Sequence, residues 1–492
     1  MKQNGLIKVS MAALAFCVST QTFAGDTAPK ATLAGDYTVK YNAQPTSVDN
    51  FADMFSKGNF FGRVRSNTFL FNYSKSTQND TLSSGLGGSL VFQSGVFDNF
   101  DARLGLYYTH GFVDNASLTT INNLKGGADV LNRPDYRANR SQDLGVLGQA
   151  YLRYSGISKS EVLVGRQLVE TFFTASNDTK MIPETFDGVV FNTNAIPNTK
   201  ATIAYLADEK MRGHADTNSP LVYSSSTTSD SINDDTAMAK GLTYTNLMKH
   251  GKSTDAPLII AEAHNTSIEN LKLDASAYNV PELVSQAMLE GNYKIALGKD
   301  FSITPGVRYL HQFDEGAGEV GGASLSGKAL TDAKIKAAYD DPTSMNSDMI
   351  AARLVTKYQN YTLNLGYSNI YGKADLIDPW RAFPTAGYTR SMARYNWYAD
   401  TRSYRIQFVA KTNIAPVLKD LNIEVSALHT DNDMAKGWQS ENYYYVGFIQ
   451  NLPALPQFQW RLRIGYDDIL NGTSNAASND NLDSRLEFNY LF

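Results

Sequence analysis

Hydrophobic and polar side chains alternate along most of the chain with a period of two, the spacing at which a β-strand turns successive side chains to opposite faces. In residues 101–109, for example, Leu104, Leu106 and Tyr108 share one face, whereas Arg103 lies on the other. Such segments predict about 18 strands of about ten residues each, the length with which a tilted strand crosses a bilayer. They lie near residues 60–72, 86–95, 101–109, 146–154, 160–169, 187–193, 200–207, 258–265, 270–278, 285–294, 301–311, 347–357, 361–369, 402–410, 421–429, 440–450, 458–466 and 485–492.

The links between these segments alternate in length. Short links such as residues 155–159 and 297–300 alternate with long ones such as 208–257 and 370–400. Outer-membrane barrels show this asymmetry because their periplasmic turns are short and their extracellular loops are long. A soluble β-sandwich or propeller does not need it. We therefore predict an all-β fold, a transmembrane antiparallel β-barrel over residues 59–492 with short periplasmic turns and long extracellular loops.

The composition narrows the possible functions and partners. Of the 492 residues 42% are hydrophobic, but no run approaches the ~20 apolar residues of a transmembrane helix, which excludes a helical membrane protein. The 44 Lys and Arg residues against 49 Asp and Glu residues give a net charge of −5, which argues against nucleic acid as a partner. The six histidines are scattered, and no HExxH or GxSxG motif is present. The sequence therefore predicts no enzymatic activity, no metal site and no cofactor.

The first residues have the pattern of a secretory signal peptide. Lys2 and Lys8 provide positive charge, a short apolar stretch follows, and Ala24 ends a motif with small residues at its cleavage positions. We predict a signal peptide at residues 1–24, whose removal would also remove Cys17, the one cysteine of the chain. Export without disulfides fits a protein of the Gram-negative envelope.

Residues 25–58 are predicted to form a periplasmic leader in front of the barrel. Residues 25–46 show no regular pattern, so we expect an irregular segment there. A short helix should follow, with Phe51 and Phe55 on one side and Ser47 as its N-cap.

Several stretches match the patterns of a known family. Residues 52–58 and 62–65 read ADMFSKG and GRVR, residues 164–167 read VGRQ, and residues 177–188 read NDTKMIPETFDG. In these stretches the chain resembles the OprD family of Gram-negative outer-membrane porins, whose opening helix, first strand and third loop they match. The terminal Phe492 is similar to the ending of outer-membrane barrels generally.

The resemblance implies both an architecture and a use. It implies a monomeric or loosely trimeric barrel of about 18 strands, with the third loop folded into the lumen. Many members of the family take up small carboxylate-bearing nutrients, others pass sugars, and a row of arginines called the basic ladder guides anions in the best-known members. Lys180 and Glu184 stand where the family commonly has Arg and Gln, so the resemblance does not give the solute.

Arginines on the polar parity of the predicted strands are the candidate pore-lining residues. A charge that faces lipid near the bilayer midplane costs ~2–4 kcal/mol, so we expect these side chains to face the lumen. Guanidinium groups bind carboxylates in a bidentate manner, and rings of such charges favour anions. The alternative is that these arginines only pair with lumen carboxylates such as Glu424, Asp483 and Glu487. The predicted ladder comprises Arg63, Arg65, Arg103, Arg153, Arg308, Arg353, Arg405, Arg461, Arg463 and Arg485.

The third loop carries mostly acidic residues. A basic wall that faces an acidic loop would create a transverse field and orient a dipolar solute, such as an amino acid or peptide. A plainly acidic constriction would instead prefer cations, and the sequence leaves both possibilities open. The predicted constriction-loop residues are Glu170, Asp178, Lys180, Glu184 and Asp187.

Together these patterns favour an outer-membrane porin that lets small hydrophilic, anionic or zwitterionic solutes diffuse passively. The expected surroundings are outer-membrane lipid and lipopolysaccharide, and the expected assembly is a monomer or a loose homotrimer. A non-specific or sugar-passing structural porin is the first alternative. An outer-membrane enzyme or adhesin built on a barrel is the second.

Overall fold

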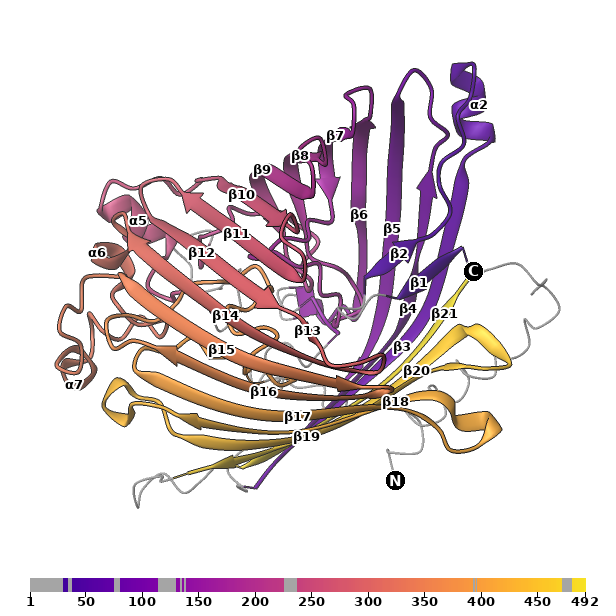
Figure 1. Cartoon of the computed structure of the whole chain (residues 1–492). Coiled ribbons are helices and arrows are strands. Elements are labelled where there is room, and N and C mark those ends of the chain that lie inside the picture. The colour runs from indigo at the N-terminus through magenta and orange to yellow at the C-terminus, as the bar shows by residue number, and fades with distance from the viewer. Residues whose placement is uncertain are drawn as a thin grey trace.

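The computed structural model describes residues 30–33, 38–74, 80–113, 130–132, 135–136, 139–224, 237–392, 394, 396–470 and 480–492. The predicted signal peptide lies outside the described residues. Within them, the main sheet closes on itself as an antiparallel barrel of 18 strands, as the alternation predicts (Figure 1). None of the described helices has the length and hydropathy that a transmembrane helix requires.

The strands of the barrel follow one another around the wall in chain order, and the last strand pairs with the first. The short strand β13 continues the arm of β12, since both pair with β14. In chain order the strands are β3 (Asn59–Tyr73), β4 (Thr81–Gln93), β5 (Phe100–Val113), β6 (Asp143–Tyr154), β7 (Ser160–Gln167), β8 (Thr185–Thr193), β9 (Thr199–Lys210), β10 (Leu258–Asn265), β11 (Leu271–Val280), β12 (Val284–Tyr293), β13 (Ile295–Ala296), β14 (Phe301–Asp314), β15 (Ser347–Tyr358), β16 (Tyr361–Ile370), β17 (Thr401–Asn413), β18 (Lys419–Asp431), β19 (Glu441–Leu452), β20 (Leu455–Ile469) and β21 (Asn481–Leu491).

The two faces of the wall differ as period-two alternation requires. On β5, Leu104, Leu106 and Tyr108 are exposed on the outer face, where the bilayer would contact them. On β3 the opposite parity brings Arg63 and Arg65 to the inner face, where both are buried. Polar side chains therefore line the lumen, and apolar side chains form the outer surface.

The connections keep the predicted asymmetry. Residues 155–159 and 297–300 are short turns at one end of the barrel, whereas residues 211–257, 315–346 and 371–400 form long loops at the other. The long connections contain α5 (Tyr244–Lys249), α6 (Ala317–Gly321) and α7 (Ala333–Lys336). The short helices η2 (Pro416–Leu418) and η3 (Met434–Lys436) lie in the connections that flank β18.

The segment before the barrel is more ordered than predicted. Strands β1 (Ala31–Leu33) and β2 (Val39–Tyr41) form a small antiparallel hairpin where we expected an irregular leader. Helix α2 (Phe51–Ser56) is present, but its N-cap is Asn50, whose side chain accepts a hydrogen bond from the Asp53 amide at 2.9 Å. The prediction of Ser47 as the N-cap is wrong, because Ser47 instead bridges to Val96.

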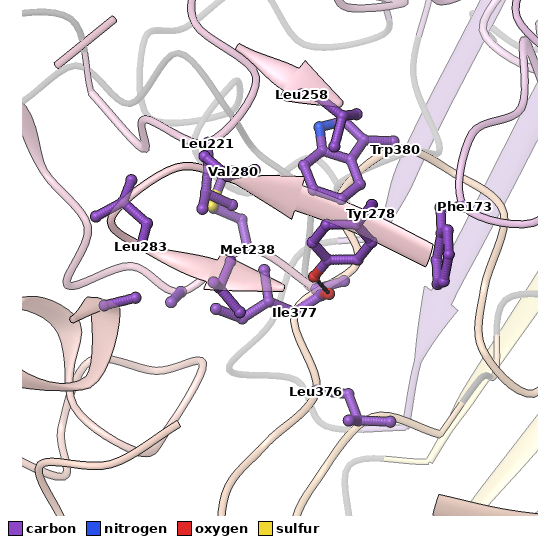
Figure 2. Close-up of a cluster of buried hydrophobic side chains, with 14 of the residues drawn as sticks. Phe173, Leu221, Met238, Leu258, Tyr278, Val280, Leu283, Leu376, Ile377 and Trp380 are labelled. Atoms are coloured by element: carbon purple, nitrogen blue, oxygen red, sulfur yellow. Dashed lines mark hydrogen bonds between the residues drawn. The ribbon is translucent and has the colours of Figure 1, made fainter. Parts of the chain in front are cut away.

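Parts of the long loops pack together inside the mouth of the barrel. Their apolar side chains form a buried cluster with inward-facing wall residues (Figure 2). Tyr278 of β11 lies at its centre, with its ring centroid 4.8 Å from those of both Phe173 and Trp380. Described parts of the loop 211–257 belong to the same cluster, through Leu221 and Met238. The hydrophobic effect therefore holds several loops in the lumen as one body.

Candidate pore constriction

The third loop, residues 168–184 between β7 and β8, is bound to the wall formed by β3 and β21. Asp178 Oδ2 lies 2.6 Å from Arg63 Nη1 and 3.2 Å from Arg65 Nη1. Arg65 Nη2 lies 2.7 Å from Glu487 Oε1 of β21. These four side chains are almost completely buried. The alternation of β3 brings both arginines to the lumen, where they anchor the loop.

Two further contacts fix the loop on other sides. Glu184 Oε2 accepts a hydrogen bond from Arg381 Nε at 2.5 Å, which joins the third loop to the β16–β17 loop, residues 371–400. Arg212, just beyond β9, donates from Nη1 to the Asn177 carbonyl at 3.0 Å. The loop is thus held by charge-assisted hydrogen bonds at its middle and at its C-terminal end.

Wall carboxylates also bind the loop backbone. Glu262 of β10 accepts a hydrogen bond from the Phe172 amide at 2.5 Å. The same carboxylate binds His264 Nε2 at 2.7 Å, and His264 Nδ1 binds Asp274 at 2.5 Å. An acidic wall patch therefore stabilises the loop, with its own charge partly balanced by the histidine.

The β16–β17 loop also enters the lumen and is held by an arginine. Arg308 of β14 donates from Nη1 to the carbonyls of Pro384 and Ala386 at 2.7 and 3.0 Å. Its other face pairs with Glu290 of β12, with Nη2 2.5 Å from the carboxylate. One buried guanidinium group thus binds the loop to the wall.

Aromatic rings cover this arginine and a second one. The Arg308 guanidinium carbon lies 4.3 Å from the ring centroid of Phe172 and 4.5 Å from that of Tyr388. The guanidinium carbon of Arg353 on β15 lies 4.7 Å from the same Tyr388 ring centroid, and Arg353 donates from Nη1 to the Gly387 carbonyl at 3.2 Å. Cation–π contacts of this kind strengthen as they are removed from water. The two inward loops therefore meet at a pair of arginines covered by aromatic rings.

A second group of arginines lies on β20 and β21. Arg463 and Arg485 stand directly opposite each other across the two strands, and Arg461 stands opposite Glu487. Asp483 binds Arg485 with both oxygens, at 2.9 and 2.6 Å. Like charges placed opposite each other destabilise an antiparallel pair. Asp483 and Glu487 offset part of the repulsion between these arginines.

Comparison with known proteins also indicates a porin. A model of the family described as outer membrane porin, OprD family, matches residues 125–413, more than half of the chain. The chain belongs to the OprD family. Its resemblance to this family in the third loop is thereby confirmed, and family and fold place the porin in the outer membrane. Among proteins with curated descriptions, none matches.

Solved structures of other porins share the fold of this porin. Acinetobacter baumannii OccAB3 is 16% identical with a TM-score of 0.67, and the match covers 89% of this chain and 99% of that one. Pseudomonas aeruginosa OccK1, also called OpdK, is 16% identical with a TM-score of 0.64, covering 88% and 98%. A further structure of Pseudomonas aeruginosa OpdK is described as containing vanillate, again at 16% identity, with a TM-score of 0.64 and coverage of 88% and 98%.

The remaining ladder arginines of the porin lie on the inner parity of their strands, but with different partners. Arg153 Nη2 lies 2.6 Å from Asp101. Arg405 Nη2 lies 3.1 Å from Glu424. These two fit the alternative in which ladder arginines pair with wall carboxylates. Arg103 is covered by the leader, as described below.

The predicted loop acids do not form one exposed acidic face. Asp187 is not in the loop but in β8, and it pairs with Arg166 of β7 at 2.7 and 2.6 Å. Each lies two positions from an exposed, outward-facing residue of its own strand, so this pair lies on the outer side of the wall. Glu170 accepts a hydrogen bond from the Ser176 amide within the loop at 2.8 Å, and Lys180 is buried.

Sequence reasoning missed several residues that shape the constriction. Glu262 and Glu290 lie on inward positions of predicted strands, so the strand alternation that identified the arginines could have found them. Arg212 and Arg381 lie in long loops, where no period exists to indicate their partners. No group of three or more acidic, histidine or cysteine side chains is arranged to hold a metal ion among the described residues.

Proposed function

We propose that this OprD-family porin is a passive diffusion channel for small hydrophilic solutes that carry a carboxylate, such as amino acids, organic acids and small peptides. The observation that carries the proposal is the opposed pair Arg463 and Arg485 with Arg461 beside them. The carboxylates beside the pair offset part of its repulsion, and an anionic solute in the lumen would offset more of it.

The local charge balance supports an anion preference. On the described inner wall of β20, β21 and β3, five guanidinium groups lie near Asp483 and Glu487 of the wall and Asp178 of the third loop, whereas Asp467 of β20 pairs with Arg394. Glu487 interacts electrostatically with four of these arginines, and Asp178 of the third loop binds two of them. The group comprises Arg63, Arg65, Arg461, Arg463 and Arg485 with Asp178, Asp483 and Glu487.

In this proposal the loop carboxylates contribute less to the expected transverse field than a free acidic loop would. Asp178 and Glu184 act first as anchors of the third loop, because each is paired with a buried arginine. The solute then meets the arginines of β20 and β21 instead of a basic wall facing a free acidic loop. The vanillate in the Pseudomonas aeruginosa OpdK structure, a small aromatic carboxylate, agrees with this class of solute.

Single-channel recording in a salt gradient tests the proposal. The mature porin should open in discrete steps with a reversal potential that shows anion preference, and added small carboxylates should compete with chloride. Arg463→Gln should reduce that preference, since it removes one charge from the lumen. The matched control is Arg402→Gln, which removes the same charge from an exposed outer position of β17.

Each other result of the recording favours an alternative function. Cation preference would keep the porin but assign control to the carboxylates of the constriction. Conduction with no ion preference and no competition by solutes would favour a non-specific or sugar-passing porin. Folded protein that never conducts would favour an enzyme or adhesin built on the barrel.

A further inference from the structure

The N-terminal arm, described as residues 30–33 and 38–46, lies inside the barrel. The ring centroid of Tyr41 is 4.6 Å from that of Phe61 on β3, and Gln149 of β6 donates to the Tyr41 hydroxyl at 3.4 Å. The guanidinium carbon of Arg103 on β5 lies 4.4 Å from the Tyr41 ring centroid. Phe61, Arg103 and Gln149 are all inward-facing, so the hairpin of the arm covers the inner wall of β3–β6 (Figure 1).

The arm approaches from the periplasmic end of the barrel. Its last residue, Thr46, accepts a hydrogen bond from the Val96 amide at 2.8 Å, and the Val48 amide donates to the Val96 carbonyl at 2.9 Å. Val96 belongs to the β4–β5 connection, one of the short turns. The hairpin therefore occupies the periplasmic half of the lumen, below the constriction.

The hairpin has two chemically different faces. One face packs on the wall and belongs to an apolar cluster that also includes Met181 and Ile182 of the third loop. The wall-facing residues are Ala31, Leu33, Val39, Tyr41 and Ala43. The alternate positions are exposed and polar, and they comprise Lys30, Thr32, Lys40 and Asn42. Because the apolar face lies against the wall, the face with both lysines looks into the lumen.

We propose that the arm is part of the selectivity filter of the channel, and that Lys30 and Lys40 are specificity-determining residues for anions in its periplasmic half. Tyr41 covers one side of Arg103, so less of that guanidinium group faces the lumen, and the arm's own lysines add positive charge there. The inference rests on the proposed function, since it concerns the same permeating anions. It adds to the strand arginines a cationic surface that the leader contributes.

The arm also bears on the constriction itself. Its apolar face shares one cluster with the tip of the third loop, so displacement of the hairpin would expose Met181 and Ile182 to water. Tyr41→Ala should therefore widen the channel as well as expose Arg103. Lys40→Gln should change ion preference with little change in conductance, because Lys40 contacts the lumen and not the wall.

Modification of a single engineered thiol tests the inference. The one cysteine of the sequence lies in the predicted signal peptide, so Lys40→Cys gives the mature protein one thiol in the arm. The neutral variant should lose part of its anion preference. A cationic methanethiosulfonate reagent added on the periplasmic side should restore the preference, and an anionic reagent should lower it below that of the neutral variant. One unit charge about 10 Å from the ion path changes the anion-to-cation permeability ratio by about twofold to fourfold.

The control is Lys299→Cys, an exposed position on a short turn at the same end of the barrel. Both reagents should leave its permeability ratio unchanged. Complete modification of the Lys40→Cys protein, verified by mass spectrometry, with no change in ion preference would overturn the role of the arm. A wild-type protein without conductance would instead refute the proposed function, so the two failures are distinguishable. Lys40→Gln gives a second, reagent-free measurement of the same charge.

Discussion

Replacing Asp178 by asparagine tests how the third loop is held. The substitution keeps the size of the side chain and removes the charge that binds Arg63 and Arg65 at 2.6 and 3.2 Å. All three side chains are at most 3% exposed, so water cannot easily replace the lost carboxylate. We expect the loop to leave its docked position more often, because two buried guanidinium groups lose a shared partner.

The magnitude follows from the burial of the pair. Removing one partner of a buried ion pair costs about 3–5 kcal/mol, which corresponds to a factor of about 10² to 10³ or more in the docking equilibrium. Asn67 and Arg212 still bind the backbone carbonyls of Thr179 and Asn177 at 2.6 and 3.0 Å. These contacts favour the lower part of the range. The barrel itself should stay folded, since the strand ladders do not depend on Asp178.

Single-channel recording gives the readout. Asp178→Asn should show a larger mean conductance and more current noise than the wild type, while its heat-modifiable band on gels stays unchanged. The control is Asp433→Asn, which removes a carboxylate paired with Lys436 at 2.8 Å in an outer turn. If Asp178→Asn recorded the same conductance and noise as this control, the anchoring role of the carboxylate would be refuted.

Two further predictions concern the β16–β17 loop. Arg308→Gln should loosen the loop, because Gln cannot reproduce both hydrogen bonds to the carbonyls of Pro384 and Ala386. The conductance should rise, and protease added to the folded barrel should cut the loop. Burial raises the pKa of the Asp375 carboxyl from its ordinary 3.8 to about 6. A raised pKa means that the packed loop favours the protonated acid, so packing should weaken as pH rises from about 4 to about 7. The protection factor of the Ala399 amide, which donates to Asp375 at 2.8 Å, should fall over that range once the exchange rate is divided by the intrinsic rate at each pH, and Asp375→Asn should flatten the dependence.

The wall of the barrel could be predicted from the sequence because its rules are local. The segment predicted near residues 258–265 is β10 residue for residue, and each of the other predicted segments overlaps one strand. The same alternation placed Arg463 and Arg485 on the inner face, since a charge facing lipid is costly. Period, length and the sequence of short and long links were sufficient for this part of the fold.

The interior could not be predicted in the same way. The pairing of Glu184 with Arg381 joins residues from two loops that have no periodic pattern. Asp187 was assigned to the loop because its motif runs on through residue 188, whereas strand pairing begins at Thr185. The hairpin of the leader was missed because each strand is only three residues long and is stabilised by the barrel wall. Tertiary contacts, not local propensity, determine these features.

The closure of the barrel has a consequence for how the channel is made. Arg63 donates to Asn489 at 2.9 and 2.6 Å, across 426 positions of sequence, and Arg65 binds Glu487 in the same seam. Contacts between positions so far apart in sequence form late, because the chain between them must first be ordered. The arginines of the first strand and the carboxylate of the last therefore meet only when the final strand is in place. Assembly intermediates would contain these residues but not their arrangement. The charged inner surface of β3 and β21 therefore forms in the same step that closes the barrel.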